Sequence, residues 1–359
     1  MSTTSAFSSA PSPATPPATP PASSPALSAQ FLGAGRIALV ERPRPEPGPG
    51  QLLIRVRANA MCGSEKGQFR DGWKTTPGHE IVGVVAQLGE GASPAIRVGD
   101  LGAIFLMDFC GGCRWCRAGL TNQCLAKRAD MGFSHDGGYG AYTVVNENIF
   151  FPIGSGIPAD EATLLLDVMG TGGHAIERAM CVHADIRTVL VNGAGPIGLG
   201  VAAMARILLG AQTRILVSDY NAFRLRLAEK LGAEAIDLAR TTVAAACAGA
   251  PDVAVDTSGK GSARLQAMEA LAQRGVLVCV GHGEDLALDV SHHLIAPERS
   301  VLGSEYFPFS DLAKNLARLR ANQAYLGQII THRFPISDLA AAFDLFWKGD
   351  TGKVIIEQR

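Results

Sequence analysis

Four of the eight cysteines in this 359-residue chain lie in a single short segment, FCGGCRWCRAGLTNQC. They are Cys110, Cys113, Cys116 and Cys124. Four thiolates on one loop can close the tetrahedral shell of a zinc ion and leave no position open for a substrate. The spacing therefore predicts a structural zinc site.

Two alternatives to zinc remain open for this segment. A bacterial ferredoxin also begins with two C-x2-C steps, but its fourth cysteine follows after three residues and precedes proline. Here Cys124 follows after seven residues and precedes Leu125, which argues against an iron–sulfur cluster. The thiols could also carry no metal, whereas disulfides are not expected in a reducing compartment.

A glycine-rich segment, VLVNGAGPIGLG, places Gly193, Gly195 and Gly198 in a G-x-G-x-x-G frame between an apolar strand and a helix. Glycine at these positions permits the tight turn and lets the backbone approach a pyrophosphate at the helix N-terminus. Pro196 and Ile197 would share in that contact. A glycine-rich turn without a ligand is the structural alternative.

An acidic residue after the glycine segment bears on which dinucleotide would bind. The next strand, RILVSD, ends in Asp219, where a carboxylate would accept a hydrogen bond from the ribose 2'-hydroxyl and repel a 2'-phosphate. This favours NAD over NADP. Arg224 leaves the second possibility open, because a nearby arginine could accept the phosphate.

The pattern of strands and helices along the chain predicts an α/β protein with two domains. From residue 31 to 158, short β-branched runs alternate with Gly and Pro turns, as in a β-rich domain. From 159 to 297, strands alternate with helical stretches, which indicates βαβ units and a doubly wound parallel sheet of the Rossmann type. Residues 298–359 return to mixed elements.

The composition narrows the expected partners to small molecules. The formal net charge of -1 gives no basic surface for nucleic acid, and no apolar run reaches the length of about 18 residues that a membrane span needs. Residues 1–30 carry no charge and are mostly Ser, Thr, Ala and Pro, which predicts a disordered tail. No targeting signal precedes Arg36, the first arginine, so we expect a cytoplasmic protein.

Three further residues could form a second metal site, one with an open position. They are Cys62 in MCGSEKG, His79 in PGHEIVGVV and Asp167 in TLLLDVMGTGGHA. Taken singly, a cysteine in an apolar segment is more often a core residue than a ligand. Their interpretation depends on the motifs around them.

Together these motifs resemble the zinc-dependent medium-chain alcohol dehydrogenases, in the branch that includes the sorbitol-type and threonine-type dehydrogenases. The similarity runs from about residue 31 to the end and includes PEPGPGQLLIRV, CGS, GHE, the four-cysteine segment, DGGYGAY, GAGPIG and GKVII. The resemblance implies a GroES-like catalytic domain over 31–158 and 298–359, with the structural zinc lobe at about 110–124. It also implies an NAD-binding Rossmann domain over 159–297.

The resemblance also implies a catalytic zinc, which would be held by Cys62, His79 and an acidic third ligand at Asp167. A catalytic zinc keeps one position free, so three protein ligands are the expected number. Glu80 is the alternative ligand, because in this family that glutamate can approach the metal. Ser64 matches the residue that accepts the proton of the alcohol.

Among the positions that depart from the family pattern, two bear on the site. Relatives commonly have aspartate where this chain has Glu65, so the carboxylate that orients the ligand histidine is longer by one methylene. Gly67 stands where some members carry a histidine that passes the proton outward. Phe69 and Trp73 could line the substrate pocket or could be packing residues.

These expectations amount to an enzyme that transfers hydride between NAD and a secondary alcohol, such as a polyol, sugar alcohol or cyclitol. Two zinc ions per chain and a homodimer or homotetramer are also expected from the resemblance. The alternatives are a biosynthetic aldehyde or ketone reductase, an amino-sugar or cyclitol dehydrogenase, and a catalytically silent nucleotide-binding protein.

Overall fold

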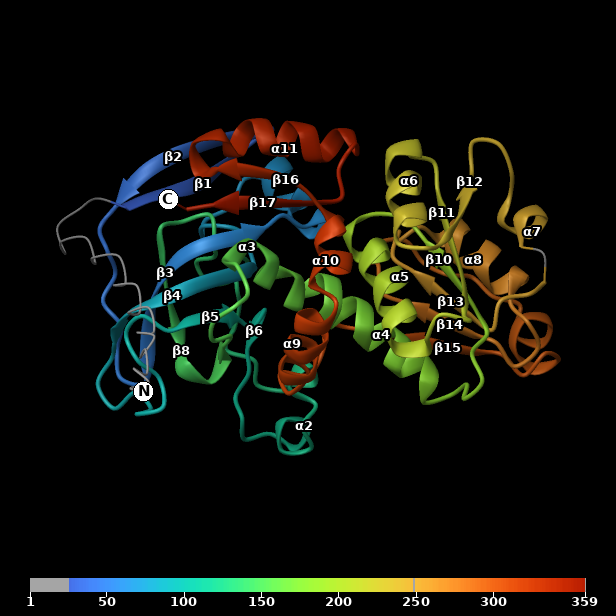
Figure 1. Ribbon diagram of the computed structural model, residues 1–359, viewed down its shortest axis with the longest axis horizontal. Helices are drawn as coiled ribbons and strands as arrows, with labels where there is room; N and C mark the ends of the chain where they lie inside the picture. The colour runs from blue at the N-terminus through green and yellow to red at the C-terminus, as the bar shows by residue number, and fades with distance from the viewer. Residues whose placement is uncertain (1–25, 248, 359) are drawn as a thin grey trace, which may run out of the picture.

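The computed structural model describes residues 26–247 and 249–358, and two sheets divide this part of the chain into two lobes (Figure 1). One lobe contains a six-stranded parallel sheet, and the other contains a seven-stranded, mainly antiparallel sheet. Helices α4 (Gly172–Met180), α9 (Asp311–Ala321) and α10 (Gln323–Leu326) lie between them. The predicted fold class, a Rossmann-type sheet with a β-rich GroES-like domain, is confirmed.

The parallel sheet has the strand order β12-β11-β10-β13-β14-β15. Its strands are β10 (Thr188–Asn192), β11 (Arg214–Asp219), β12 (Glu234–Asp237), β13 (Val253–Asp256), β14 (Val276–Cys279) and β15 (Ser300–Gly303). The first strand, β10, lies in the middle, and the chain winds outward from it in both directions. This is the order of a doubly wound dinucleotide-binding sheet.

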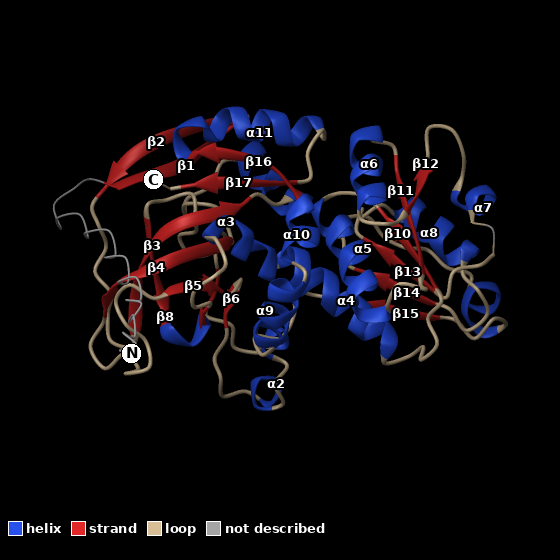
Figure 2. Cartoon of the chain, viewed as in Figure 1, coloured by secondary structure: helices blue, strands red, loops and turns tan. Residues whose placement is uncertain are grey.

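Helices cover both faces of this sheet because its central strands are apolar on both sides (Figure 2). Val189 and Val191 of β10 belong to the large core that includes α5 (Pro196–Leu209). Leu190, between them, belongs to the opposite core that includes α8 (Gly261–Ala270). The helices α6 (Ala222–Lys230) and α7 (Val243–Ala246) complete the lobe.

The second lobe is built around the long strand β3 (Gln51–Ala60), in the sheet order β16-β17-β3-β4-β5-β9 with β8 also paired to β3. The other strands are β4 (Glu80–Leu88), β5 (Leu101–Ile104), β8 (Tyr142–Asn146), β9 (Phe150–Pro152), β16 (Ile330–Pro335) and β17 (Lys353–Glu357). The last strand, β17, lies antiparallel to β3. The C-terminal segment therefore belongs to this β-rich lobe, with which the described part of the chain also begins.

Short elements fill the rest of this lobe. They are β2 (Arg36–Arg42), β6 (Met107–Asp108), β7 (Ala129–Asp130), α1 (Lys66–Asp71), α2 (Arg114–Arg117), α3 (Ala159–Ala162) and α11 (Leu339–Lys348). Helix α11 packs its apolar side, including Phe343 and Phe346, into a separate core with Phe31 and Tyr139. Met61, which precedes Cys62 in the chain, belongs to the same core.

The predicted extent of the N-terminal tail, 1–30, is wrong at its C-terminal end. Strand β1 (Ala26–Gly33) pairs antiparallel with β2, and Ala29 is fully buried. The Ala29 N–H also donates to the carbonyl of Tyr139 at 2.7 Å. The small residues of this segment bury little apolar surface, and pairing with the neighbouring strand orders them. The rest of the predicted tail, residues 1–25, lies outside the described residues.

The predicted end of the Rossmann domain, residue 297, falls too early. Strand β15 (Ser300–Gly303) pairs in parallel with β14 and is the sixth strand of the same sheet. The sequence SVLG is too short and too mixed in polarity to predict a strand. It forms one by pairing with the edge of β14. The parallel sheet therefore continues to Gly303.

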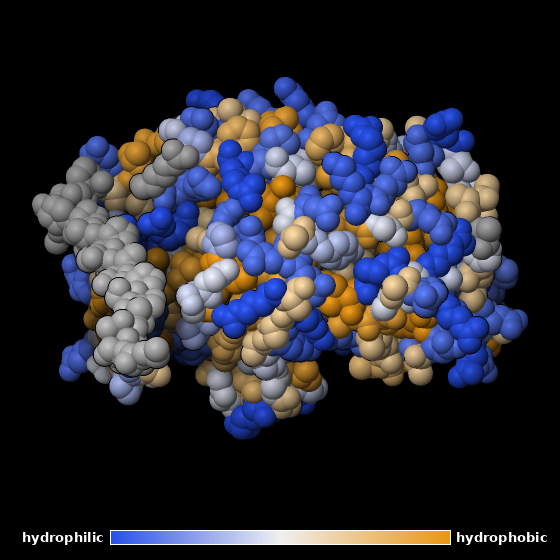
Figure 3. Space-filling view, viewed as in Figure 1, coloured by the Kyte–Doolittle hydropathy of each residue, from blue (hydrophilic) through white to orange (hydrophobic). Residues whose placement is uncertain are grey.

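The surface in Figure 3 shows hydrophilic and hydrophobic side chains intermixed over the visible face. Within the described residues, no helix has both the length and the apolar character needed to cross a membrane. The predicted absence of a membrane-spanning helix therefore holds for this part of the chain.

Candidate active site

Four ligand-type side chains meet where the two lobes join. Ala60, at the end of β3, pairs with Glu80, at the start of β4, so Cys62 and His79 emerge side by side from neighbouring strands. Asp167 comes from a different part of the chain and begins a π-helical turn, Asp167–Thr171, that leads into α4. The ligand atoms of Cys62, His79, Glu80 and Asp167 lie within 4.8 Å of one another.

Asp167 is the centre of this group. Its Oδ2 lies 3.3 Å from Cys62 Sγ and 3.2 Å from His79 Nε2. Its Oδ1 accepts a hydrogen bond of 3.0 Å from the Thr171 hydroxyl, one turn further along. Thr171 thus fixes the carboxylate so that the second oxygen faces the cysteine and the histidine. All of these residues are buried.

The other nitrogen of His79 faces a second carboxylate. Glu65 Oε1 lies 3.6 Å from His79 Nδ1, and Glu65 Oε2 accepts hydrogen bonds from the Tyr139 hydroxyl at 2.7 Å and the Cys62 N–H at 3.4 Å. The Glu65 carboxylate therefore faces the imidazole across 3.6 Å, and neither Oε1 nor Nδ1 has a hydrogen-bond partner among the described residues. Tyr139, in the DGGYGAY segment, was not recognised in the sequence as part of this arrangement.

Burial determines the acid–base properties of the group. Burial and the charge of Asp167 raise the pKa of Cys62. Burial disfavours a charged His79, yet hydrogen bonds to Asp167 and Cys62 raise its pKa well above the ordinary value. The pKa of Asp167 is lowered in spite of burial, because His79 donates to it. The pocket therefore favours a positive charge beside the Asp167 carboxylate.

Glu80 forms a buried ion pair with Lys353 of β17, and both side chains are fully inaccessible. Burial raises the pKa of Glu80 to about 8 although Lys353 acts in the opposite direction. The second oxygen, Oε2, has no hydrogen-bond partner among the described residues. Sequence reasoning missed Lys353, and the available signal was a lysine within the apolar run of GKVII.

A cavity of about 460 Å³ connects this group with the glycine-rich segment. It is lined by Cys62, Ser64, His79, Asp167 and Thr171 on one side and by Gly195, Pro196, Ile197, Gly198 and Arg224 on the other. The structure thus brings the two predicted sets of site residues together. Phe69 and Trp73 are not among the lining residues, because Phe69 stacks on Phe343 and the Trp73 indole donates to the Phe133 carbonyl.

Tyr306 also lines the cavity and was not singled out in the sequence. Its φ of +44° is a left-handed conformation that is uncommon for a residue with a side chain. Burial and the charge of Asp167 raise the pKa of its hydroxyl, which keeps it protonated. Strained residues of this kind concentrate at functional sites, so the observed conformation agrees with a role in the cavity.

The glycine-rich turn has the geometry that close approach requires. Gly193 has a φ of +96°, and a Cβ on Gly198 would lie 1.8 Å from the Gly193 carbonyl oxygen. A Cβ on Gly195 would meet only Arg224 Nη1, at 3.9 Å, so the space above this residue is open. Gly195 caps α5 without a side-chain hydrogen bond, which leaves the first N–H groups of the helix for a ligand.

Asp219 lies at the end of β11 beside this turn. Its Oδ2 accepts a hydrogen bond of 2.7 Å from the Ala194 N–H, and its Oδ1 accepts one of 2.8 Å from the Asn221 N–H. Arg224 Nε donates to the Thr351 carbonyl at 3.1 Å, which ties α6 to the β-rich lobe. Asp219 therefore holds the glycine turn, and Arg224 extends into the cavity.

The four cysteines of residues 110–124 also converge, at a place separate from the cavity. The sulfur atoms of Cys110, Cys113, Cys116 and Cys124 lie within 4.8 Å of one another, and none is in a disulfide. Backbone N–H groups of Cys116 and Leu125 lower the pKa of Cys113 to about 6. Burial instead raises the pKa of Cys116 to about 12. The backbone thus favours a thiolate at one position of the cluster first.

Two models of known protein families match the chain. Residues 48–155 match the alcohol dehydrogenase GroES-like domain, and residues 196–321 match the zinc-binding dehydrogenase domain. These regions contain the four-cysteine segment, Cys62 and His79, and the end of the glycine turn from Pro196 to Gly198 with the strands that follow it. The two matched regions correspond to the two lobes of the structure.

Curated relatives and solved structures resemble the chain over most of its length. It is 32% identical to L-threonine 3-dehydrogenase of Shewanella frigidimarina over 340 residues, which is 89% of this chain and 96% of the relative. It is 31% identical to that of Coxiella burnetii over 335 residues, 89% and 95% of the two chains. The alcohol dehydrogenase TADH from Thermus sp. ATN1 has the same fold, with a TM-score of 0.83 at 23% identity over 93% of this chain and all of that one (100%).

Proposed function

The chain belongs to the zinc-dependent medium-chain alcohol dehydrogenases, a family of oxidoreductases, and from this premise we propose which residues perform the reaction. The substrate is a secondary alcohol with neighbouring hydroxyl groups, and the hydride acceptor is NAD. One observation carries the proposal: the Cys62, His79 and Asp167 group and the glycine turn line the same cavity.

Cys62, His79 and Asp167 would hold the catalytic zinc. A tetrahedral ion with ligands at about 2.0 to 2.3 Å separates them by about 3.3 to 3.8 Å, and the two distances to Asp167 Oδ2 are 3.3 and 3.2 Å. The donor types and the preference for a positive charge also fit. When bound, zinc acts as a Lewis acid that makes the alcohol hydroxyl easier to deprotonate. Glu80 is the reserve ligand.

The protein's own groups orient this site and move the proton. Thr171 fixes the Asp167 carboxylate, and Tyr139 holds the Glu65 carboxylate beside the His79 ring, where it can orient the imidazole. Ser64 is exposed and lines the cavity two residues after Cys62, so its hydroxyl would accept the alcohol proton and release its own through the nicotinamide ribose to solvent. No side chain occupies position Gly67, so water takes the outer step.

The glycine turn would anchor the pyrophosphate of the dinucleotide. The open space over Gly195 and the uncapped start of α5 support this placement. When bound, NAD supplies the carbon that receives the hydride. Asp219 disfavours a 2'-phosphate, which makes NAD the preferred cofactor. Asp219→Gly should weaken NAD binding and improve the relative use of NADP, and an unchanged preference would contradict this role.

The four-cysteine lobe would hold a second zinc that is structural. Cys110 Sγ and Cys116 Sγ are 4.0 Å apart, close to the separation of about 3.8 Å between two thiolates on one tetrahedral zinc. Four sulfur ligands leave no open position, so this ion takes no part in catalysis. We also expect a cytoplasmic homodimer or homotetramer, which sedimentation of the purified protein and its location in fractionated cells would check.

The deciding experiment is a substrate screen with the purified full chain. Polyols and other secondary alcohols are offered with NAD, aldehydes and ketones are offered with NADH, and the absorbance of reduced nicotinamide is followed. Metal analysis of the same protein should give two zinc ions per chain. Turnover of no alcohol by a protein that contains both ions would contradict the proposal, and preferred reduction of aldehydes would favour a biosynthetic reductase.

A further inference from the structure

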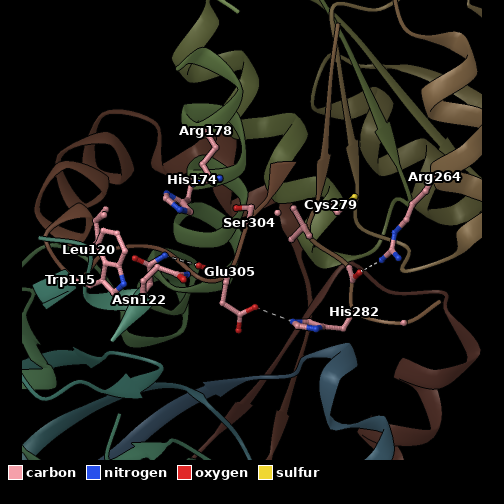
Figure 4. Close-up of a pocket in the computed structure, with 15 residues that line it drawn as sticks. Trp115, Leu120, Asn122, His174, Arg178, Arg264, Cys279, His282, Ser304 and Glu305 are labelled. Atoms are coloured by element: carbon pink, nitrogen blue, oxygen red, sulfur yellow. Dashed lines mark hydrogen bonds and ion pairs between the residues drawn. The ribbon is translucent and has the colours of Figure 1, made fainter. Parts of the chain in front are cut away.

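A second and larger cavity, of about 750 Å³, adjoins the catalytic cavity (Figure 4). It lies between the four-cysteine segment, from which Trp115 and Leu120 line it, and the loops that follow β14 and β15. The residues that line both cavities are Val280, Gly281, His282, Ser304 and Glu305. One substrate could therefore extend from the first cavity into the second.

An ion pair marks the junction of the two cavities. His282 Nε2 lies 3.2 Å from Glu305 Oε2, as the dashed line in Figure 4 shows. The side chain of His282 is 86% exposed and that of Glu305 is 41% exposed. Because solvent reaches both groups, the pair is worth little to stability, and it presents polar atoms to whatever passes between the cavities.

One face of a single helical segment runs from the metal-type residues to the second cavity. Asp167 and Thr171 line the catalytic cavity, whereas His174 and Arg178 line the second one. The four residues follow one another at spacings of four, three and four, which keeps them on one side of a helix. The π-helical turn Asp167–Thr171 and helix α4 follow each other without a break, so this segment leads from one cavity to the other.

Arg178 is the uncommitted cation of the second cavity. Its Nε is buried and has no hydrogen-bond partner among the described residues. The acid beside it in sequence, Glu177, pairs instead with Lys314 at 2.7 Å and Arg318 at 3.3 Å. The other arginine that lines the cavity, Arg264, is neutralised by Asp256 at 2.8 Å.

The group next to Arg178 does not form a cation site. Ligand atoms of His174, Glu177 and Asp311 do lie within 4.8 Å of one another. However, the Lys314 ammonium already sits between the two carboxylates, 2.7 Å from Glu177 and 3.1 Å from Asp311. Burial and the charge of Arg178 lower the pKa of His174 to about 4, so the histidine adds a neutral hydrogen-bonding ring to the cavity.

Two more polar groups of this cavity lack partners. Asn122 is 7% exposed and donates from Nδ2 to the Glu305 carbonyl, but its Oδ1 has no partner among the described residues. Ser304 is 8% exposed, and its hydroxyl is likewise unpaired. Buried polar groups are normally satisfied, so these atoms point to a polar ligand or to ordered water.

We propose that the second cavity binds an anionic group, a phosphate or a carboxylate, at the far end of the alcohol substrate, with Arg178 as its cation. This inference rests on the proposed function of the catalytic cavity. The substrate is then an extended polyhydroxy compound whose reacting carbinol lies at Asp167 and whose anion passes the His282–Glu305 junction to reach Arg178. The Ser304 hydroxyl donates to the same anion.

Matched substrates test the inference. The purified holoenzyme is assayed with NAD on ribitol and on ribitol 5-phosphate. The anionic member of this pair should have the higher kcat/KM. Arg178→Ala should lower kcat/KM for that member about 10- to 100-fold more than for its neutral partner, because one charged hydrogen-bonding group is removed. Arg178→Lys should recover part of this selectivity.

A binding measurement separates this inference from the proposed function. Inorganic phosphate is titrated calorimetrically into the holoenzyme with saturating NAD, which fills the pyrophosphate site. The wild type should bind phosphate at least 10-fold more tightly than Arg178→Ala, whereas Arg240→Ala, an exposed arginine outside both cavities, should match the wild type.

Three outcomes would overturn the inference. They are equal losses on charged and neutral substrates, phosphate binding that Arg178→Ala leaves unchanged, and a change of oligomeric state in this variant, which would make the cavity an interface. If neutral alcohols are oxidised but the anionic ones are not preferred, the proposed function stands and this inference fails. If no alcohol is oxidised while phosphate still depends on Arg178, the proposed function fails and the anion site stands.

Discussion

The two metal-type clusters of this protein are built in opposite ways. The four cysteines of the lobe come from fifteen consecutive positions, 110–124, and each remains partly exposed. Cys62 and Asp167 are separated by 105 positions, and they meet in a buried site between the lobes. The first cluster depends on a short loop alone, whereas the second depends on the folding of both lobes.

The difference extends to the charges around each cluster. Backbone N–H groups surround the lobe thiols, as where Cys113 N donates to Cys110 Sγ at 3.3 Å. The buried cluster is instead surrounded by ionisable side chains, including Glu65, Glu80 and Lys353. Buried charges are costly unless they are paired, so a site of this kind is retained for its chemistry. A local site in contact with water can serve as a structural clamp.

The largest effect is expected from the buried cluster. Asp167→Asn should lower kcat/KM about 100- to 1,000-fold, because the charged ligand that faces Cys62 and His79 is lost. Zinc analysis should show one ion per chain instead of two, and NAD binding should remain. Full turnover with both ions present would instead make Glu80 the third ligand.

A substitution in the four-cysteine segment should change the stability of the protein more than its catalytic activity. Cys113→Ser is expected to lower the free energy of unfolding by about 3 kcal/mol and the melting temperature by roughly 4 °C. Thermal unfolding followed by circular dichroism measures this change. The kcat/KM of the molecules that remain folded should change less than in Asp167→Asn, and the comparison would break down if Cys113→Ser lost activity without losing stability.

A pH dependence distinguishes His79, which belongs to the buried cluster, from His174, which lines the second cavity. The pKa of His79 is raised, whereas burial lowers that of His174 from 6.5 to about 4. Between these two values the unfolded chain binds a proton that folded His174 does not, so stability falls as the pH falls from about 6.5 to 4. The loss should reach up to about 3 kcal/mol, and His174→Gln should remove this part of the acid sensitivity.

Urea denaturation at several pH values measures the effect, with wild type and His174→Gln compared at each pH. A variant with glutamine remains neutral and keeps a polar group in the cavity. Parallel curves for the two proteins between pH 6.5 and 4 would show that His174 is protonated in the folded state.

The smallest effect concerns the rates at which the cysteines are alkylated, and not stability or catalysis. In metal-free protein, Cys110 and Cys113 should react with iodoacetamide at least about tenfold faster than Cys62, because backbone N–H groups lower the pKa of both thiols, whereas Cys62 is buried and its thiol pKa is raised. Peptide mapping by mass spectrometry after timed labelling measures each site. Exposed Cys181 serves as the internal reference for a fully accessible thiol.

The spacing of residues in the sequence was sufficient to predict the motifs that form within a single loop. The C-x2-C-x2-C-x7-C segment and the G-x-G-x-x-G turn each form within one loop, so residue types at fixed intervals already specify the geometry. The ends of elements were harder to predict. Ala26–Gly33 has little β-branched character and became a strand only because β2 pairs with it.

Contacts between distant segments were not visible in the sequence. Nothing near Glu80 indicates that Lys353 would neutralise it, and nothing near His79 indicates that Tyr139 would hold Glu65. Tyr306 is another example, because its importance comes from a backbone conformation and from its position over the cavity. Each of these residues acts through a partner more than 70 positions away or through the tertiary shape.

The sequence by itself determined the two-domain α/β organisation, the sulfur cluster and the nucleotide-type turn, because short-range sterics and ligand spacing suffice for these. Only the tertiary structure decided that Asp167 faces Cys62 and His79, and that Arg178 lies on the same helical face beside a second cavity. Such arrangements depend on the packing of one lobe against the other, which no local interval of residues encodes.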